Sequence, residues 1–482
     1  MGADPPNFDD SVFWHGLDPE HGGPLAPPCS WDEFRHRVVE SFRPTHKDLS
    51  PTKKKKVRSG PPQGVDVKDL SSAGWGVIFA KDTDPKIRNA LTPLLEHRRA
   101  QSGNLFKIFE GNEGLIPGQT ADDWLITRGI GPGVGHVEHI PYYLMVVADP
   151  SRLPFGVEFD LGAGYAVGRL AFDKISDYER YALNVVQTEQ IPVRRRPSLT
   201  IFNQRHADDR ATDCSSRHLI HPIIEQLKKE GRPLETVLVE EATKERLSEL
   251  LGGPETPSIL FSAGHGLGPG KNGKYAEAAG SLVCHDYPGP KVWGKKRVPP
   301  EYYFAASDID EDADLRGLVA LFFGCYTAGL PEHDSFTFEG EPRRIAQRPI
   351  ISSLAKGLLA HKNGALAVLG HVDIAWGHSY VWRGHSQPFT FLSVLKALLD
   401  QEPIGAAARY LGSRYLQIAL IHSQQRERLA RGGEVDKDTF VRHWIAEKDA
   451  RSYLVVGDPA VRARPITSTS DLGPNRHCPP ND

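Results

Sequence analysis

Apolar runs of strand length alternate with helical segments over most of this chain of 482 residues, and this alternation constrains the fold more than any other feature. The strand-like runs lie at 76–80, 142–147, 165–170, 199–202, 236–239, 258–261, 318–323, 365–369 and 453–456. Most of them are separated by segments of helical periodicity, which implies right-handed crossovers and a mostly parallel sheet. The sequence therefore predicts an α/β fold.

The length and the composition indicate several parts. A chain of 482 residues exceeds the roughly 250–300 residues at which a single core stops growing. We expect a partly flexible N-terminal extension over residues 1–70 and an α/β subdomain over 71–250. A second α/β subdomain over 251–466 and a disordered tail over 467–482, rich in Ser, Thr, Pro and Asn, complete the chain.

Charge and hydropathy exclude some classes of function. The formal net charge of -3 gives no support to nucleic-acid binding or to a membrane-surface role. No run approaches the ~18 apolar residues of a transmembrane helix. The start of the sequence lacks the basic and apolar regions of a secretion signal, so we expect a cytoplasmic protein. The five cysteines are scattered and are expected to be free thiols.

Two strand-like runs end in a small residue followed by a reactive side chain, which is His265 in one case and Cys325 in the other. The carboxyl edge of a parallel sheet is where α/β proteins build active sites. A free thiol titrates near about 8.5, so a close imidazole is needed to activate it as a nucleophile. Gly266 and Gly324 permit sharp turns and close approach of a substrate, and backbone N–H groups at Gly266 and Cys325 could hold an oxyanion.

Each residue also has an ordinary interpretation: Cys325 as a small buried hydrophobe and His265 as a satisfied loop histidine. The occurrence of both at strand ends, each beside glycine, favours a reactive pair.

His-Gly after one strand and Gly-Cys after a later one resemble the clan of peptidases that contains caspases, legumain, separase, gingipains and the bacterial CHAT domains. Three further segments resemble gingipains in particular: Tyr165 to Arg169, Gly364 to His371 and Leu454 to Pro459. The resemblance covers roughly residues 70–465. It implies a caspase-like fold with two adjacent, mostly parallel sheets, a His-Cys dyad and endopeptidase activity on protein or peptide substrates.

The resemblance also implies a specificity pocket. In gingipains an acidic residue upstream of the Gly-Arg motif selects Arg or Lys, and the matching position here is Asp160, which could equally be an ordinary loop carboxylate. Two weaker candidates come from the residues themselves. Asp149 follows a strand and could orient His265, although Asp-Pro is also a common turn, and Trp376 could form a pocket wall or belong to the core.

The sequence departs from gingipains in lacking a secretion signal and in carrying a lysine-rich insertion, which includes Lys271 and Lys274. A broad cytosolic protease would damage its host, so we expect control by a partner, a signal or self-cleavage. The basic run from Lys53 to Arg58 is a candidate cleavage site.

Cofactor motifs are weak. The segment from Gly268 to Tyr275 matches Gly-x4-Gly-Lys but lacks the Ser or Thr that a P-loop needs for magnesium. The run from Cys284 to Asp286 has no complementary ligand pair, so we expect neither a metal nor a cofactor. Two other classes remain open: a catalytically silent caspase-like module that binds a partner through its cleft, and a doubly wound NTPase or transferase.

Overall fold

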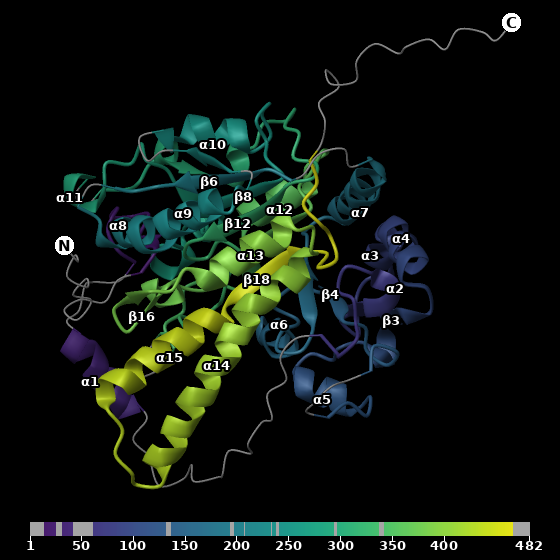
Figure 1. Cartoon of the computed structure of the whole chain (residues 1–482), viewed down its shortest axis with the longest axis horizontal. Helices are drawn as coiled ribbons and strands as arrows, with labels where there is room; N and C mark the ends of the chain where they lie inside the picture. The colour runs from purple at the N-terminus through teal and green to yellow at the C-terminus, as the bar shows by residue number, and fades with distance from the viewer. Residues whose placement is uncertain are drawn as a thin grey trace, which may run out of the picture.

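A computed structural model describes residues 14–25, 31–41, 61–131, 136–192, 197–206, 208–232, 234–237, 241–293, 296–336 and 342–465. Within them a ten-stranded sheet runs through the molecule and carries helices on both faces (Figure 1). In spatial order its strands are β3 (Phe106–Phe109), β2 (Trp75–Phe79), β4 (Tyr143–Val147), β5 (Ala166–Leu170), β18 (Tyr453–Gly457), β15 (Ala367–His371), β12 (Val319–Phe323), β8 (Ile259–Ala263), β6 (Leu199–Asn203) and β7 (Glu235–Val237).

The α/β class is confirmed. Neighbouring strands from β3 to β5 and from β15 to β7 pair in parallel, whereas β18 pairs antiparallel with β15. The two sheets expected from the sequence are joined edge to edge into one, through a single register pair between Arg169 of β5 and Val456 of β18. The division of the chain near residue 250 falls between β7 and β8 and stays a prediction.

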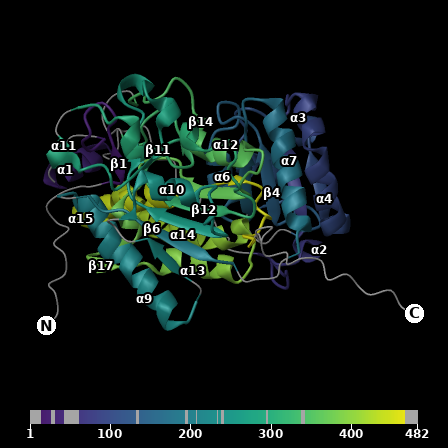
Figure 2. The ribbon, with the colours of Figure 1, turned by 90° about the horizontal axis from the view of Figure 1, so that it is seen from above.

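The helices surround this sheet. They are α1 (Trp31–Ser41), α2 (Leu70–Ala73), α3 (Pro85–Ala90), α4 (Thr92–Ser102), α5 (Ala121–Ile126), α6 (Gly156–Leu161), α7 (Ile175–Gln190), α8 (Arg210–Ser215), α9 (His221–Lys229), α10 (Lys244–Leu250), α11 (Pro290–Trp293), α12 (Ser353–Ala360), α13 (Phe389–Leu399), α14 (Ile404–Ala430) and α15 (Lys437–Arg451). Figure 2 shows α13 and α14 on one side of the sheet and α12 on the other.

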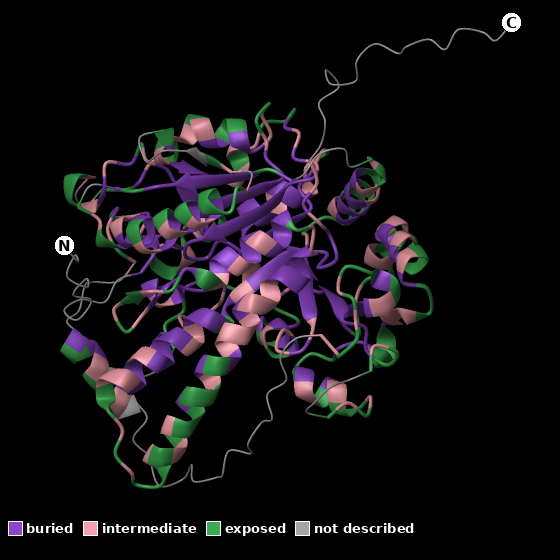
Figure 3. Ribbon diagram, in the orientation of Figure 1, coloured by how far each residue is buried: buried purple, intermediate pink, exposed green. Residues whose placement is uncertain are grey.

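Local sequence accounts for the boundaries of these elements. The chain from Asp84 to Ser102 forms two helices, α3 and α4, which meet at Leu91, and each has a proline in its first turn. The Asp84 carboxylate caps α3 by accepting a hydrogen bond from the backbone N–H of Lys86. The central strands are buried on both faces, which explains why they read as continuous apolar runs (Figure 3).

A smaller four-stranded sheet lies beside the carboxyl ends of β8 and β12. Its order is β1 (Gly16–Leu17), β9 (Gly266–Leu267), β10 (Leu282–Val283) and β11 (Tyr303–Phe304). Two further pairs are β13 (Gly329–Leu330) with β14 (Ile350–Ile351) and β16 (Val381–Trp382) with β17 (His385–Ser386). The first strand of this sheet comes from the N-terminal extension, so part of that extension is ordered and packed on the body of the protein.

Candidate active site

His265 and Cys325 follow adjacent strands. β8 and β12 pair in parallel up to Ala263 and Phe323, and each reactive residue comes two positions later. The two therefore occupy equivalent positions at one edge of the sheet, as the sequence predicts. Both are buried, with 3% of His265 and none of Cys325 exposed.

The Cys325 thiol faces the segment that follows β15. Its sulfur accepts a hydrogen bond from the backbone N–H of Ala375 at 3.2 Å. Burial raises the pKa of the thiol well above its ordinary value, which keeps it protonated. In the hydrogen bonding of the described residues nothing joins this thiol directly to His265.

Asp209 orients His265. Its Oδ2 atom lies 2.6 Å from His265 Nε2, and Asp209 follows β6, which pairs directly with β8. Burial alone would raise the pKa of Asp209, but the charge and hydrogen bond of His265 and the hydroxyl of Thr212 hold it below its usual range. Asp209 also caps α8 through the backbone N–H of Ala211. The contact leaves His265 Nδ1 buried and without a hydrogen bond among the described groups.

Two backbone N–H groups converge on one carbonyl oxygen beside the thiol. The oxygen belongs to His15, and it accepts hydrogen bonds from Cys325 N at 2.8 Å and from Gly266 N at 3.1 Å. Cys325 and Gly266 are the donors that the sequence predicts for an oxyanion. Glycine is required at 266 because a Cβ atom there would lie 1.9 Å from the carbonyl oxygen of Cys325. At Gly324 a Cβ atom would lie 2.9 Å from Gly266 N, so this glycine also preserves the donor pair.

The segment between β15 and β16 lies beside the thiol, and its Trp376 belongs to the hydrophobic core. Trp376 is 1% exposed, and its ring packs edge-on against Trp14 with centroids 5.4 Å apart. The buried carboxylate of Asp449 holds this segment in place. It accepts hydrogen bonds from Trp376 N at 2.8 Å and from the Ser379 hydroxyl at 2.5 Å.

Asp149 does not orient His265, and the structure gives that contact to Asp209. Asp149 instead lies 2.9 Å from Arg348 and accepts a hydrogen bond from the Ser151 N–H. Strand order is the reason. β4, which precedes Asp149, is five strand positions from β8 in the sheet, about 24 Å at the usual spacing between strands.

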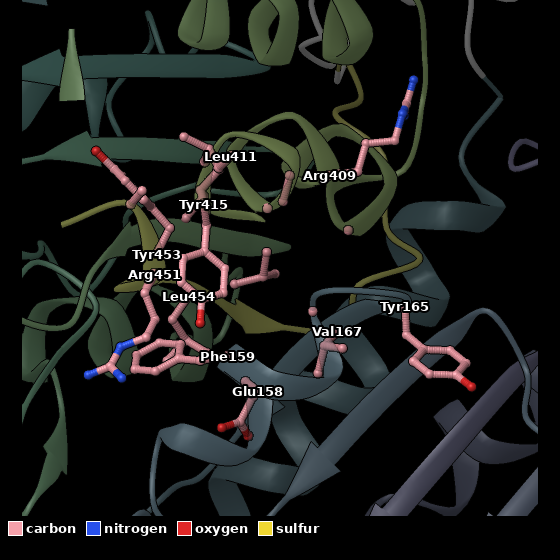
Figure 4. Close-up of a pocket in the computed structure, with 17 residues that line it drawn as sticks. Glu158, Phe159, Tyr165, Val167, Arg409, Leu411, Tyr415, Arg451, Tyr453 and Leu454 are labelled. Atoms are coloured by element: carbon pink, nitrogen blue, oxygen red, sulfur yellow. The ribbon is translucent and has the colours of Figure 1, made fainter. Parts of the chain in front are cut away.

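Asp160 is exposed on α6, the helix between β4 and β5. Two residues of α6, Glu158 and Phe159, line a pocket with Tyr415 of α14 and Arg451 (Figure 4). The Arg451 guanidinium lies 5.7 Å from the Phe159 ring, and Glu158 is engaged by Arg169 at 2.6 Å. This pocket contains neither His265 nor Cys325, and four steps of strand order separate β4 from β12.

Sequence reasoning missed three residues of the site: His15, Asp209 and Tyr380. A signal existed for Asp209, because Asp208 and Asp209 closely follow an expected strand. His15 and Tyr380 lie in segments without periodicity. Backbone strain also marks the site, since Tyr326, next to the thiol, has a φ of 61°.

Several predictions fall outside the described residues. They concern the basic run from Lys53 to Arg58, Cys29, Cys478 and the tail after residue 466. Among the helices that the structure does describe, none combines the length and the hydropathy of a membrane span.

Fold and site together define an α/β protein with a thiol, an imidazole and paired backbone donors at one sheet edge. No family model and no curated protein matches the chain. Among solved structures it is similar to the Arg-specific cysteine proteinase gingipain R, with a TM-score of 0.47, 12% identity and coverage of 81% of this chain and 78% of that one.

Two other solved structures give similar values. One described as a protease has a TM-score of 0.46 and 13% identity, with 82% of this chain and 80% of the other covered. The complex of the RgpB pro- and mature domains from Porphyromonas gingivalis has a TM-score of 0.46 and 11% identity, with 81% and 80% covered. These similarities concern the course of the backbone, so the function proposed below rests on the geometry of the site itself.

Proposed function

We propose that the protein is a cysteine endopeptidase whose nucleophile is Cys325. One observation carries this proposal: the N–H groups of Cys325 and Gly266 both donate to a peptide carbonyl, at 2.8 and 3.1 Å, beside the thiol. Donors so placed stabilise the negative charge that develops on oxygen when a nucleophile attacks the carbonyl carbon. The substrate class is therefore a peptide in extended conformation.

The residues of the site divide the reaction between them. The sulfur of Cys325 attacks the carbonyl carbon after its proton passes to His265, and the two N–H groups hold the oxyanion. His265 returns a proton to the leaving amine, and water then hydrolyses the thioester. Asp209 keeps the His265 ring in orientation through Nε2, which leaves Nδ1 as the nitrogen for proton transfer. Asp209 is thus a positioning residue.

We infer a cytosolic enzyme that acts on protein substrates and is held in check by a partner, a signal or self-cleavage. Preference for Arg or Lys depends on Asp160 alone. Asp160 lies on α6, away from β12, so Asp160→Ala tests this preference directly: a loss of Arg or Lys cleavage of well over tenfold supports it, and unchanged cleavage refutes it.

A comparison of cysteine variants tests the proposed nucleophile. Residues 14–17 lie over the thiol, and a Cβ atom at Gly16 would lie 2.7 Å from Cys325 Sγ, so the assay uses a Gly16→Ala background. This enzyme should cleave peptides of a mixed library, and adding Cys325→Ala should abolish cleavage without changing thermal unfolding. Cys284→Ala is the matched control, because Cys284 is also fully buried but makes its contact with Leu282.

A catalytically silent module that binds a partner through the cleft is the second candidate. It is favoured by the complete burial of Cys325 and by the raised pKa of its thiol. A folded Gly16→Ala protein that cleaves no peptide of the library would establish this candidate and refute the peptidase.

A further inference from the structure

Residues 14–17 of the chain cross the candidate active site on both sides of the thiol. On one side His15 N donates to Ala375 O at 2.9 Å, and Trp14 pairs antiparallel with Trp376. On the other side Gly16 and Leu17 form β1, which pairs in parallel with β9. Addition of an extended strand to an exposed sheet edge is a common mode of peptide recognition. This segment is therefore held as a peptide substrate would be held.

One peptide bond of the segment lies against both the thiol and the two N–H donors. The carbonyl oxygen of His15 takes both oxyanion donors, and the Cys325 thiol lies against Gly16. Any side chain at position 16 would collide with the sulfur, since a Cβ atom there would lie 2.7 Å from it. The bond presented to the thiol is the one between His15 and Gly16.

The His15 side chain fills a pocket formed by Phe323 and Tyr380. It is fully buried, and its ring meets the Phe323 ring edge-on with centroids 4.7 Å apart. His15 Nε2 lies 3.0 Å from the Tyr380 hydroxyl. Within the described chain, no hydrogen bond or ion pair of this imidazole involves a carboxylate.

The charges around the pocket favour a neutral occupant. Burial, together with the nearby His265, lowers the pKa of His15 to about 3, although Asp209 and Asp449 act in the opposite direction. A guanidinium or ammonium group cannot shed its charge so easily, and the two nearby carboxylates are already engaged, Asp209 by His265 and Asp449 by Trp376 N and the Ser379 hydroxyl. The pocket thus fits an uncharged ring that can share a hydrogen bond with a phenol.

The part of the segment after the bond is anchored in the fold. Leu17 is buried against Leu267 and Val283 in the smaller sheet, and Gly268 N donates to Leu17 O at 2.7 Å. Farther on, Val298 N donates to Pro19 O at 2.9 Å. A break at Gly16 would leave this part in place and release the preceding residues, which would empty the His15 pocket.

We propose that the protein cleaves its own chain between His15 and Gly16, and that the pocket formed by Phe323 and Tyr380 selects a neutral imidazole before the cleaved bond. This inference rests on the proposed peptidase function. Cys325 sulfur forms a bond to the His15 carbonyl carbon while the bond to Gly16 nitrogen breaks and that nitrogen gains a proton from His265. Water then splits the thioester, which yields a carboxylate at His15 and returns the thiol.

N-terminal sequencing and intact mass of the purified full-length protein test the cleavage. The wild type should acquire a new N-terminus at Gly16, whereas Cys325→Ala should stay intact. A wild type that stays whole, or that is cut elsewhere, overturns the inference.

Two variants test the selection of imidazole. His15→Arg should slow self-cleavage at least tenfold, whereas an enzyme that prefers Arg or Lys would cut this variant faster than the wild type. Tyr380→Phe removes a single hydroxyl and should slow cleavage after His15 by about tenfold, the usual worth of one hydrogen bond. Tyr410→Phe, near the start of α14, removes a hydroxyl that contacts Arg409 instead, so it is the control and should cleave normally. Unchanged cleavage in both His15→Arg and Tyr380→Phe refutes the role of the pocket.

Docking of residues 14–17 over Cys325 can be measured without any catalysis. His265→Ala keeps the thiol but cannot complete the reaction, and in this background alkylation of Cys325 by iodoacetamide reports access. Adding Gly16→Ala should speed alkylation at least tenfold by expelling the segment. Gly23→Ala is the matched control, because a Cβ atom at Gly23 meets nothing within 4 Å. Equal alkylation in all three proteins contradicts docking of the segment.

Failure of this inference differs from failure of the proposed function. If the wild type stays whole while Gly16→Ala cleaves library peptides after other residues, only self-cleavage and imidazole selection are refuted. If neither protein cleaves anything, the peptidase function is refuted together with them.

Discussion

At the scale of single residues, Asp209 has two roles. Its carboxylate accepts from His265 and also caps α8, so one side chain ties the imidazole to the start of a helix. The contact is short, at 2.6 Å, and the Asp209 carboxylate is largely buried. Asparagine can still cap a helix, so Asp209→Asn should keep the helix cap and remove only the charge beside His265.

Asp209→Asn, made in the Gly16→Ala background, should lower kcat for peptide cleavage about 10²-fold or more, because His265 loses the charge that orients it and stabilises its protonated form. KM should change little, since Asp209 does not line the peptide path. The control is Asp208→Asn, whose parent side chain is exposed and lies 3.7 Å from Lys291. Loss of activity in Asp208→Asn of the same size would contradict the assignment to Asp209.

His15 makes docking of the N-terminal segment dependent on pH. Its pKa is lowered to about 3 when docked, mainly by burial and then by His265, so docking releases a proton at any pH between that value and the free value of 6.5. Docking is therefore at full strength above pH 6.5 and weakens as the pH falls below it.

Between pH 7.5 and pH 5.5 docking should weaken by about tenfold. The measurement is the rate of Cys325 alkylation in His265→Ala, divided at each pH by the rate in the same protein with Gly16→Ala, which cancels the titration of the thiol. A ratio that stays constant over this range would show that His15 is not buried in the neutral form.

At the scale of elements, the N-terminal segment is fixed at two places. β1 belongs to the smaller sheet, and α1 packs against α15, as Figure 1 shows. In the second contact Arg35 lies 2.7 Å from Asp438, and the Phe34 and Trp444 rings are 6.5 Å apart. The segment over Cys325 is thus part of a larger docked unit.

A buried arginine and two carboxylates connect the β3–β5 half of the large sheet to the half that begins at β18. Arg98 of α4, 1% exposed, donates to Glu189 of α7 and to Asp458, which follows β18, both at 2.7 Å. Trp75 adds a hydrogen bond to Asp458 at 2.9 Å. The Gly-Asp-Pro segment that resembles gingipains therefore has a structural role here.

Arg98→Met should lower the free energy of unfolding by about 3–5 kcal/mol, because it removes the buried guanidinium that the Glu189 and Asp458 carboxylates share. Arg180→Ala, which removes an exposed pair with Asp177, should cost less than about 1 kcal/mol. Urea unfolding followed by circular dichroism measures both. Equal losses in the two variants would contradict the role given to Arg98.

At the scale of the whole molecule, periodicity predicts which segments are strands but not their order. Runs ending at His265 and Cys325 are adjacent because β8 and β12 pair, and the sequence prediction of a shared edge agrees with this. The choice between Asp149 and Asp209 depends on which strands neighbour β8, and local sequence holds no information on that.

The N-terminal segment escaped prediction for a different physical reason. β1 has two residues, Gly16 and Leu17, and its partner β9 lies some 250 residues further along the chain. So short a strand has no periodicity, and its position is set by tertiary contacts alone. The contacts of α15 likewise depend on the tertiary fold, because its Asp449 accepts hydrogen bonds from Trp376 and Ser379, which are distant in the sequence.

The most direct test of the peptidase assignment is mass spectrometry of the folded Gly16→Ala protein after reaction with a peptidyl acyloxymethyl ketone that ends in Trp-His. We expect one covalent adduct, on Cys325, and a much slower reaction when His265→Ala is added. Absence of an adduct, or an adduct on Cys214 or Cys284 instead, would contradict the claim that Cys325 is the nucleophile.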